Sequence, residues 1–188
     1  MKEKINLYPI DQNDQVLEQE FEVVEDLDSF VRDLLAKTNI VLVAEKNCLV
    51  STRDAQLGEL VDTRPRTNIN NKIYCFSEAK RTVNDANQII VKNPDGEEYL
   101  MSYEKFFQRY SKQDEGWVSK GEPQKFVVVH ENIVIQPKNW GGEKQYICNG
   151  GLLNITDKND IYGITNHAFD NTYKITKKID IKQREIEK

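Results

Sequence analysis

Apolar residues recur with a helical period between residues 27 and 35. Asp26 and Asp28 stand at the start of this stretch, where a carboxylate accepts hydrogen bonds from the free N–H groups of a first helical turn. Five apolar residues occupy positions i, i+3, i+4, i+7 and i+8, and so share one face of a helix: Leu27, Phe30, Val31, Leu34 and Leu35. The pattern predicts an amphipathic helix that packs on a core through this face.

Short apolar runs on either side of this helix predict strands. Residues 21–24 precede it, and residues 40–44 form a continuous β-branched and aliphatic run, as in a buried strand. Residues 48–51 read as a second strand, which gives a βαβ unit followed by a hairpin. Beyond this portion, residues 53–60 and 78–83 read as short helical segments. The polar, proline-containing segment 63–71 is the predicted boundary.

The second half of the chain combines strand and turn signals. Residues 88–92 and 97–101 flank the turn sequence Asn-Pro-Asp-Gly at 93–96, which predicts a hairpin. Ser102 is the expected N-cap of a helix over residues 103–110. Residues 111–124 read as a linker, and residues 126–130, 133–136 and 145–148 as strands. Ile175, Ile179 and Ile181 predict a last strand that frays into a charged tail within residues 174–188.

Two segments of this half align with each other without a gap when Ile89 is matched with Leu152. This shift along the sequence is called the repeat offset below. Residues 87–110 and 150–173 both read as an apolar pair, a polar turn, Tyr, six residues, Phe, three residues and Tyr. The matching aromatic pairs are Tyr99 and Tyr162, Phe106 and Phe169, and Tyr110 and Tyr173. We interpret these aromatics as core residues rather than as a ligand site. The predicted fold is α+β, with segments 1–62 (acidic α/β portion), 63–124 (first repeat unit with linker) and 125–188 (second unit with charged tail).

Composition restricts the classes of function. The chain of 188 residues has no apolar run long enough to span a membrane. Its net charge is −5, and residues 1–60 carry 13 acidic against 6 basic residues. Clustered Lys and Arg are scarce, which argues against duplex nucleic acid as a partner. Asp26, Asp28 and Asp33 mark the acidic portion, which is either an ordinary solvated face or a contact face for a basic protein.

Candidate chemistry is sparse. The three cysteines, Cys48, Cys75 and Cys148, form no paired motif, and with no signal peptide they favour a reducing compartment, the cytoplasm of a bacterium. His130 and His167 complete no nucleophile pair or zinc motif in the sequence. Phosphate-binding glycine motifs are absent too. The sequence therefore predicts no catalytic residues, no metal and no cofactor, and it favours a protein that is not an enzyme.

One loop stands out as a binding feature. Trp140 adjoins Gly141 and Gly142, and Tyr146 follows in the next predicted strand. Paired glycines either expose backbone N–H groups to an anion or permit tight turns, and an exposed Trp suits stacking or docking. The alternative is a Trp that covers the edge of the core. This loop is the predicted site if the protein binds a small ligand or nucleotide.

The hairpin–helix sequences carry a family resemblance. Residues 93–110, Asn-Pro-Asp-Gly-Glu-Glu-Tyr-Leu-Met-Ser-Tyr-Glu-Lys-Phe-Phe-Gln-Arg-Tyr, with residues 160–164 and 169–173, resemble PGDYG-type proteins of phages and prophages over about residues 85–175. The Pro-Gly-Asp-Tyr motif after which these proteins are named does not occur in this sequence. Asn149–Leu152 occupies the place where the motif is expected. The resemblance implies a β-rich module and phage or prophage origin. We therefore expect a non-enzymatic binding or regulatory protein with a host or defence protein as partner, and a small-ligand or nucleotide-binding protein as the alternative.

Overall fold

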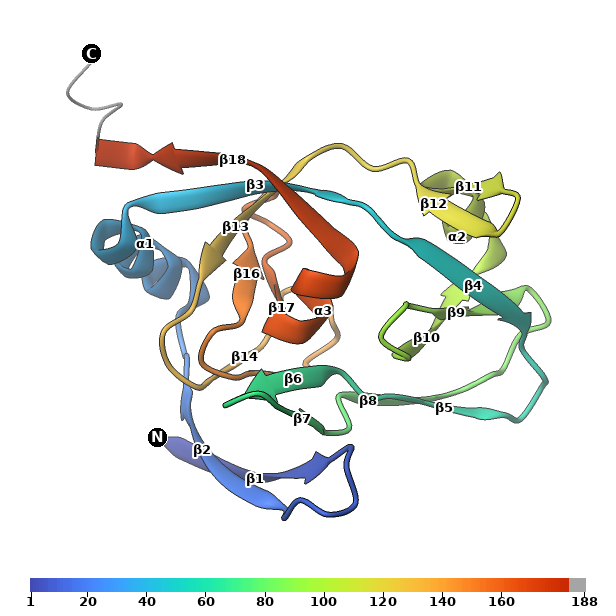
Figure 1. The fold of residues 1–188 in the computed structure, drawn as a ribbon, viewed down its shortest axis with the longest axis horizontal. Helices are drawn as coiled ribbons and strands as arrows, with labels where there is room; N and C mark the ends of the chain where they lie inside the picture. Colours follow the sequence, from blue (N-terminus) through green and yellow to red (C-terminus); the bar gives the residue numbers. More distant parts are fainter. Residues whose placement is uncertain (183–188) are drawn as a thin grey trace.

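The computed structural model describes residues 1–182 and is built mainly from β-strands (Figure 1). Strands hold 48% of the residues and three short helices hold 15%, so the predicted α+β class is wrong and the fold is β-rich. The helices are α1 (Leu27–Thr38), α2 (Tyr103–Arg109) and α3 (Asn166–Thr172). Two segments that read as helices, 53–60 and 78–83, instead lie in strands and tight turns.

The strands form four sheets. A six-stranded sheet has the order β15 (Gln145–Ile147), β14 (Ile133–Ile135), β2 (Leu17–Val23), β1 (Lys2–Pro9), β7 (Lys72–Cys75) and β6 (Arg66–Ile69). The first five-stranded sheet has the order β10 (Glu98–Ser102), β9 (Gln88–Lys92), β4 (Leu49–Asp54), β12 (Gly116–Ser119) and β11 (Tyr110–Gln113). The second has the order β17 (Tyr162–Ile164), β16 (Leu152–Asn154), β13 (Gln124–Val128), β3 (Ile40–Lys46) and β18 (Tyr173–Asp180). A two-stranded sheet pairs β5 (Leu60–Thr63) with β8 (Ala79–Thr82).

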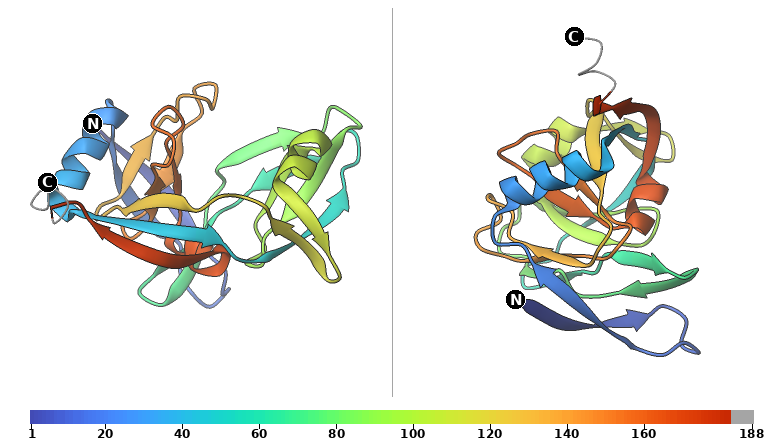
Figure 2. Two further views of the ribbon diagram at one scale, coloured as in Figure 1. Left: turned by 90° about the horizontal axis from the view of Figure 1, so that it is seen from above. Right: turned by 90° about the vertical axis from the view of Figure 1, so that its left-hand side faces the viewer.

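Two long ribbons connect the five-stranded sheets. β3 leads into β4 and β12 leads into β13, so each ribbon supplies one strand to each sheet (Figures 1 and 2). β4 and β13 each occupy the central place in their sheet, while β12 and β3 lie next to them. The two sheets therefore have the same strand arrangement, although β3 comes from the start of the chain. The segment predicted to be a linker, 111–124, provides β11 and β12 and is not a linker.

The registers of the two sheets also agree at the repeat offset. Each hairpin pairs corresponding positions: Tyr99 with Val91 and Met101 with Ile89, against Tyr162 with Asn154 and Ile164 with Leu152. Ser102 and Thr165 both cap the following helix through a side-chain oxygen, and Tyr110 and Tyr173 both follow its last residue. Residues 87–110, here called the first unit, and residues 150–173, the second unit, thus fold alike.

Helix α1 confirms the apolar stripe read from the sequence. Val31 and Leu34 are buried in a cluster that includes Val127 and Leu153, and Leu27, Phe30 and Leu35 pack against that cluster. Asp26 is the N-cap, since its carboxylate accepts from the Ser29 N–H at 3.1 Å. The predicted βαβ unit is wrong, however, and so is the predicted hairpin after it, because β3 and β4 belong to different sheets. β2 and β3 belong to different sheets, because β2 pairs with β1 and β14 while β3 pairs with β13 and β18.

The polar segment 63–71, predicted to be the boundary, contains a strand. Arg66–Ile69 forms β6, which pairs with β7 and lies against the N-terminal end of α3 through Asn166. Its backbone gains partners far away in sequence, which a local pattern does not reveal. At the end of the chain, β18 accounts for the predicted last strand, and the rest of the predicted tail, residues 183–188, lies outside the described residues.

Candidate functional site

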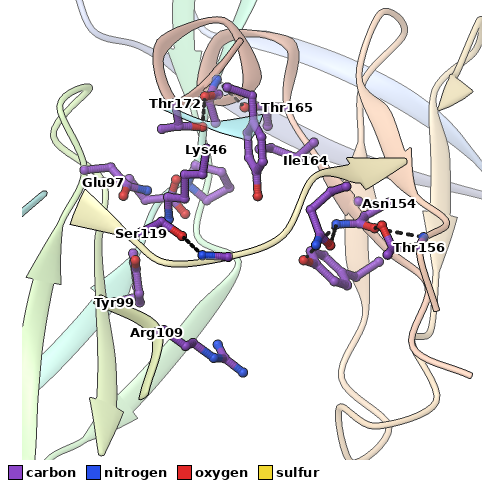
Figure 3. A pocket seen from close by; sticks show the side chains of 18 of the residues that line it. Lys46, Glu97, Tyr99, Arg109, Ser119, Asn154, Thr156, Ile164, Thr165 and Thr172 are labelled. Carbon is purple, nitrogen blue, oxygen red and sulfur yellow. Dashed lines mark hydrogen bonds between the residues drawn. The ribbon is translucent and has the colours of Figure 1, made fainter. Parts of the chain in front are cut away.

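A cavity of about 730 Å³ lies between the two units. Figure 3 shows Glu97, Tyr99 and Arg109 on one side of the open space and Asn154, Thr156 and Ile164 on the other. The walls come from the hairpins, the ends of α2 and α3, and the ribbons that join the sheets. The sheet faces that carry the repeated residues therefore lie on opposite sides of the cavity.

Corresponding positions of the two units line the same cavity. Six pairs at the repeat offset do so: Asn93 and Thr156, Glu97 and Asp160, Tyr99 and Tyr162, Met101 and Ile164, Arg109 and Thr172, and Tyr110 and Tyr173. Lys46 and Ser119 add a seventh pair through strand register, since Lys46 faces Tyr173 across β3–β18 and Ser119 faces Tyr110 across β12–β11. The repeat therefore shapes the cavity as well as the fold.

Lys46 joins a hydrogen-bonded group on the first side of the cavity. Its ammonium lies 2.7 Å from the Tyr110 hydroxyl and 5.2 Å from the centre of the Tyr110 ring. The Tyr110 hydroxyl is also 2.9 Å from that of Tyr99. Burial, followed by the neighbouring Tyr110, raises the pKa of Tyr99 well above its usual range. The Tyr99 phenol therefore remains neutral and can accept from, or donate to, polar groups in the cavity.

The second side is arranged differently. Asn154 Nδ2 lies 3.0 Å from the Tyr162 hydroxyl and 3.2 Å from Gln124 Oε1. Burial raises the pKa of Tyr173, and Tyr162 and Tyr110 raise it further. Within residues 1–182 no side chain forms a hydrogen bond with the Tyr173 hydroxyl, in contrast to that of Tyr110. The Tyr173 ring lies stacked on Phe169, with the ring centres 5.5 Å apart.

Two carboxyl groups of the cavity wall hold protons near neutral pH. Burial raises the pKa of Glu97 to about 8, and nearby Glu78 and Asp95 contribute in the same direction while Lys46 and Arg66 oppose it. Burial also raises the pKa of Glu78 to about 7. Carboxyl groups with pKa values raised by burial cluster at functional sites, because binding and catalysis need groups whose protonation is tuned by their surroundings.

The turn before Glu97 contains unpaired polar atoms. Asp95 Oδ1 accepts from the Glu97 N–H at 3.0 Å. Asn93 Oδ1 and Asp95 Oδ2 are buried and, among residues 1–182, meet no hydrogen-bond donor. Asn93 also lines the cavity. A buried acceptor without a donor costs stability, so this turn favours a partner that donates hydrogen bonds.

The predicted binding loop reaches the cavity in part. Trp140 and Tyr146 both line it. Tyr146 donates to Glu3 Oε2 at 2.7 Å, and burial together with this carboxylate raises the pKa of Tyr146 to about 12. Gly141 and Gly142 have φ values of 63° and 86° and lie exposed outside the lining residues. They serve the turn, which was the alternative reading of these glycines.

The predicted acidic residues lie away from the cavity. Asp26 is occupied as the N-cap of α1, and Asp28 forms an ion pair with Lys138 at 3.1 Å. Asp33 lies exposed on the same helix. Their predicted contact with a protein partner therefore stays a prediction.

The thiols and imidazoles do not enter the cavity wall. His130 is exposed, and neither it nor His167 lines the cavity. Burial raises the pKa of Cys148 to about 11 and also raises that of Cys48, which opposes thiolate formation. Among residues 1–182 no group of three or more His, Cys, Asp or Glu side chains is placed to hold a metal ion.

Sequence reasoning missed Lys46, Glu78 and Glu97 as site residues. The repeat contained a signal for Glu97, because the offset that pairs Tyr99 with Tyr162 also pairs Glu97 with Asp160. No local pattern pointed to Lys46, whose role depends on pairing of β3 with β18 across the chain.

In comparisons with known proteins, no protein-family model, curated protein or solved structure matches the chain. The resemblance to PGDYG-type proteins and the phage or prophage origin therefore stay predictions. No helix in residues 1–182 is long and apolar enough to cross a membrane.

Proposed function

We propose that the protein binds a small organic ligand in the cavity between its two units. The observation that carries this proposal is the lining of one cavity by seven pairs of corresponding residues. A volume of about 730 Å³ lies within the range of small-molecule sites, roughly 300–1,000 Å³. Tyrosine rings and aliphatic side chains provide apolar contact with a ligand. Carboxyl, amide and hydroxyl groups provide hydrogen bonds that orient it.

The lining also fits binding rather than packing. Tyr99, Tyr162 and Tyr173 are only half-buried, although Tyr99 and Tyr173 each pack against a core cluster. Glu78 and Glu97 retain protons near neutral pH because protein surrounds them, yet both reach the cavity. A wall with this mixture of apolar surface and oriented polar groups is typical of a ligand site.

A thermal-shift screen tests the proposal. The library contains nucleosides, sugars, amino acids, alkyl amines and dicarboxylates at millimolar concentration. A ligand that binds only the native state raises the melting temperature by mass action. We expect at least one class to do so with the unmodified protein, and no shift across the whole library overturns the proposal.

Cavity-filling variants locate the binding. Met101→Trp and Ile164→Trp place a bulky ring at corresponding positions of the two walls, and each should abolish the shift. Leu57→Trp is the control, because Leu57 is exposed and does not line the cavity. Shifts that persist in both filled variants would place the ligand elsewhere. The pair guards against a single variant that fails to fold.

A further inference from the structure

The two sides of the cavity differ in charge at two pairs of corresponding residues, Lys46 with Ser119 and Arg109 with Thr172. On the first side Lys46 places an ammonium against the Tyr110 hydroxyl at 2.7 Å and above the Tyr110 ring. Its charge also opposes the rise in the pKa of Glu97. An ammonium group, two tyrosines and a carboxyl group thus form one cluster. A cation is attracted to the face of an aromatic ring, and also to a carboxyl group where that group, unlike Glu97, has lost its proton.

The second side repeats the cluster without the cation. Tyr173, Tyr162 and Asp160 correspond to Tyr110, Tyr99 and Glu97 at the repeat offset, and all of them line the cavity. The position that corresponds to Lys46 is Ser119, which faces Tyr110 just as Lys46 faces Tyr173. A serine side chain carries no charge, and Ser119 Oγ accepts from the Gly121 N–H at 3.1 Å (Figure 3).

One hydroxyl of this second cluster remains available, whereas the Tyr162 hydroxyl accepts from Asn154 Nδ2 at 3.0 Å. The Tyr173 hydroxyl has no side-chain partner among residues 1–182, whereas its counterpart Tyr110 has two. Two acidic residues besides Asp160 line the cavity wall, Asp157 and Glu122. Arg109, which is exposed, is the positive group that acts on Tyr162. A ligand cation in this place gains from the carboxylates and is opposed by Arg109.

We propose that the ligand is an aliphatic primary amine whose ammonium group lies among Tyr173, Tyr162 and Asp160. This place on the second side corresponds to the place of the Lys46 ammonium on the first side. This inference rests on the proposed function and specifies its ligand. The remainder of the amine extends along Ile164 and Met101, the corresponding aliphatic residues of the two walls. The ammonium group of the amine thus takes, beside Tyr173, the place that the Lys46 ammonium takes beside Tyr110.

Calorimetric titration with matched compounds tests the charge requirement. The probes are butylamine, 1,4-diaminobutane, butanol, 1,4-butanediol and succinate, which share chain length and differ in end groups. We expect the amines to bind and the alcohols and succinate not to bind under the same conditions. Alcohols that bind as well as amines, in a manner blocked by Ile164→Trp, overturn the inference and leave the proposed function intact. Succinate binding that Arg109→Gln abolishes also overturns it.

Three variants test the position of the ammonium group. Ser119→Lys introduces a built-in ammonium where the ligand is proposed to bind, so amine affinity should fall roughly tenfold or more. Ser51→Lys adds the same charge at an exposed position outside the cavity, and affinity should stay within about twofold. Arg109→Gln removes the opposing charge and should strengthen amine binding.

The outcomes separate the two proposals. Unchanged amine affinity in Ser119→Lys, with a melting temperature showing that the variant is folded, overturns the ammonium position. Weaker amine binding in Arg109→Gln overturns it as well. If none of the probes and no member of the wider library binds, the proposed function itself falls.

Discussion

The ammonium group of Lys46 lies 2.7 Å from the hydroxyl of Tyr110, although the two residues belong to different five-stranded sheets. Lys46 lies at the end of β3, next to Tyr173 in register, and its side chain crosses to the opposite unit. This contact ties the two sheets together at the wall of the cavity. It also makes the otherwise similar sides of the cavity chemically unequal.

Replacement of Lys46 should lower stability through this contact. Lys46→Met keeps much of the aliphatic chain but removes the charged donor to Tyr110, which we expect to cost about 1.5–3 kcal/mol. Lys112→Met is the matched control, because the Lys112 ammonium also lies 5.2 Å from an aromatic ring centre, that of Trp117, but on an exposed side chain. Urea unfolding measures both, and equal losses would contradict the prediction.

The two N-caps should differ in strength. Ser102 Oγ accepts from the Lys105 N–H at 3.3 Å, and Thr165 Oγ1 accepts from the Ala168 N–H at 3.1 Å. Thr165 also donates to the carbonyl of Arg66 in β6. Ser102→Ala should therefore cost about 1 kcal/mol, and Thr165→Ala about 2 kcal/mol because a second hydrogen bond is lost. Denaturant midpoints test the order, and a larger loss for Ser102→Ala would refute it.

The repeated phenylalanines should be equivalent in energy. Phe106 and Phe169 are buried, and each stacks on the tyrosine that follows its helix, with ring centres 4.9 Å and 5.5 Å apart. Phe106→Ala and Phe169→Ala should each cost about 3–5 kcal/mol. Phe107→Ala, at an exposed neighbour, should cost less than about 1.5 kcal/mol. Thermal or urea unfolding of the three variants measures these losses in stability. A small loss at either buried position would contradict the prediction that the two phenylalanines are equivalent.

Glu97→Gln should stabilise the protein at alkaline pH and have little effect at pH 4. Burial raises the pKa of Glu97 from 4.5 to about 8, so between these values the folded state keeps a proton that the unfolded state has lost. The wild-type free energy of unfolding therefore falls as pH rises through this range. Glutamine removes the dependence, for a gain of about 4–5 kcal/mol at pH 8–9.

Urea unfolding between pH 4 and pH 9 measures this effect. Glu104→Gln, at an exposed position of α2, is the control and should change stability little at either end of the range. A difference between Glu97→Gln and the unmodified protein that stays constant with pH would show that the carboxyl group does not keep its proton in the fold.

Local patterns predicted the elements whose signals lie within a few residues. The stripe on α1 and the Asn-Pro-Asp-Gly turn between β9 and β10 are such cases, because a helix face and a tight turn depend on neighbouring residues. Strands β6, β8, β11 and β12 were missed. They are short and carry few apolar side chains, so the alternation that marks a strand is weak even where β6 and β11 form hairpins with the next strand.

The candidate site could be predicted from the sequence only in part. The repeat offset identified the tyrosine pairs, but we interpreted them as core residues, and this holds for Tyr110 more than for the half-buried Tyr99 and Tyr162. All three line the cavity between the two units, which no local pattern in the sequence reveals. Trp140 and Tyr146 were predicted as binding residues and do line it. The contacts of Lys46 come from a remote strand, which periodicity does not encode.

The pairing of β3 with β18 has a consequence for the order of folding. Lys46 and Tyr173 are register partners although more than half of the chain separates them. During synthesis β4, β9, β10, α2, β11 and β12 all leave the ribosome before β13, so the first five-stranded sheet has all its strands early. The second sheet must keep β3 unpaired at one edge until the last strand arrives. Such distant contacts slow folding, so the nascent chain exposes a sheet edge that is open to unwanted association.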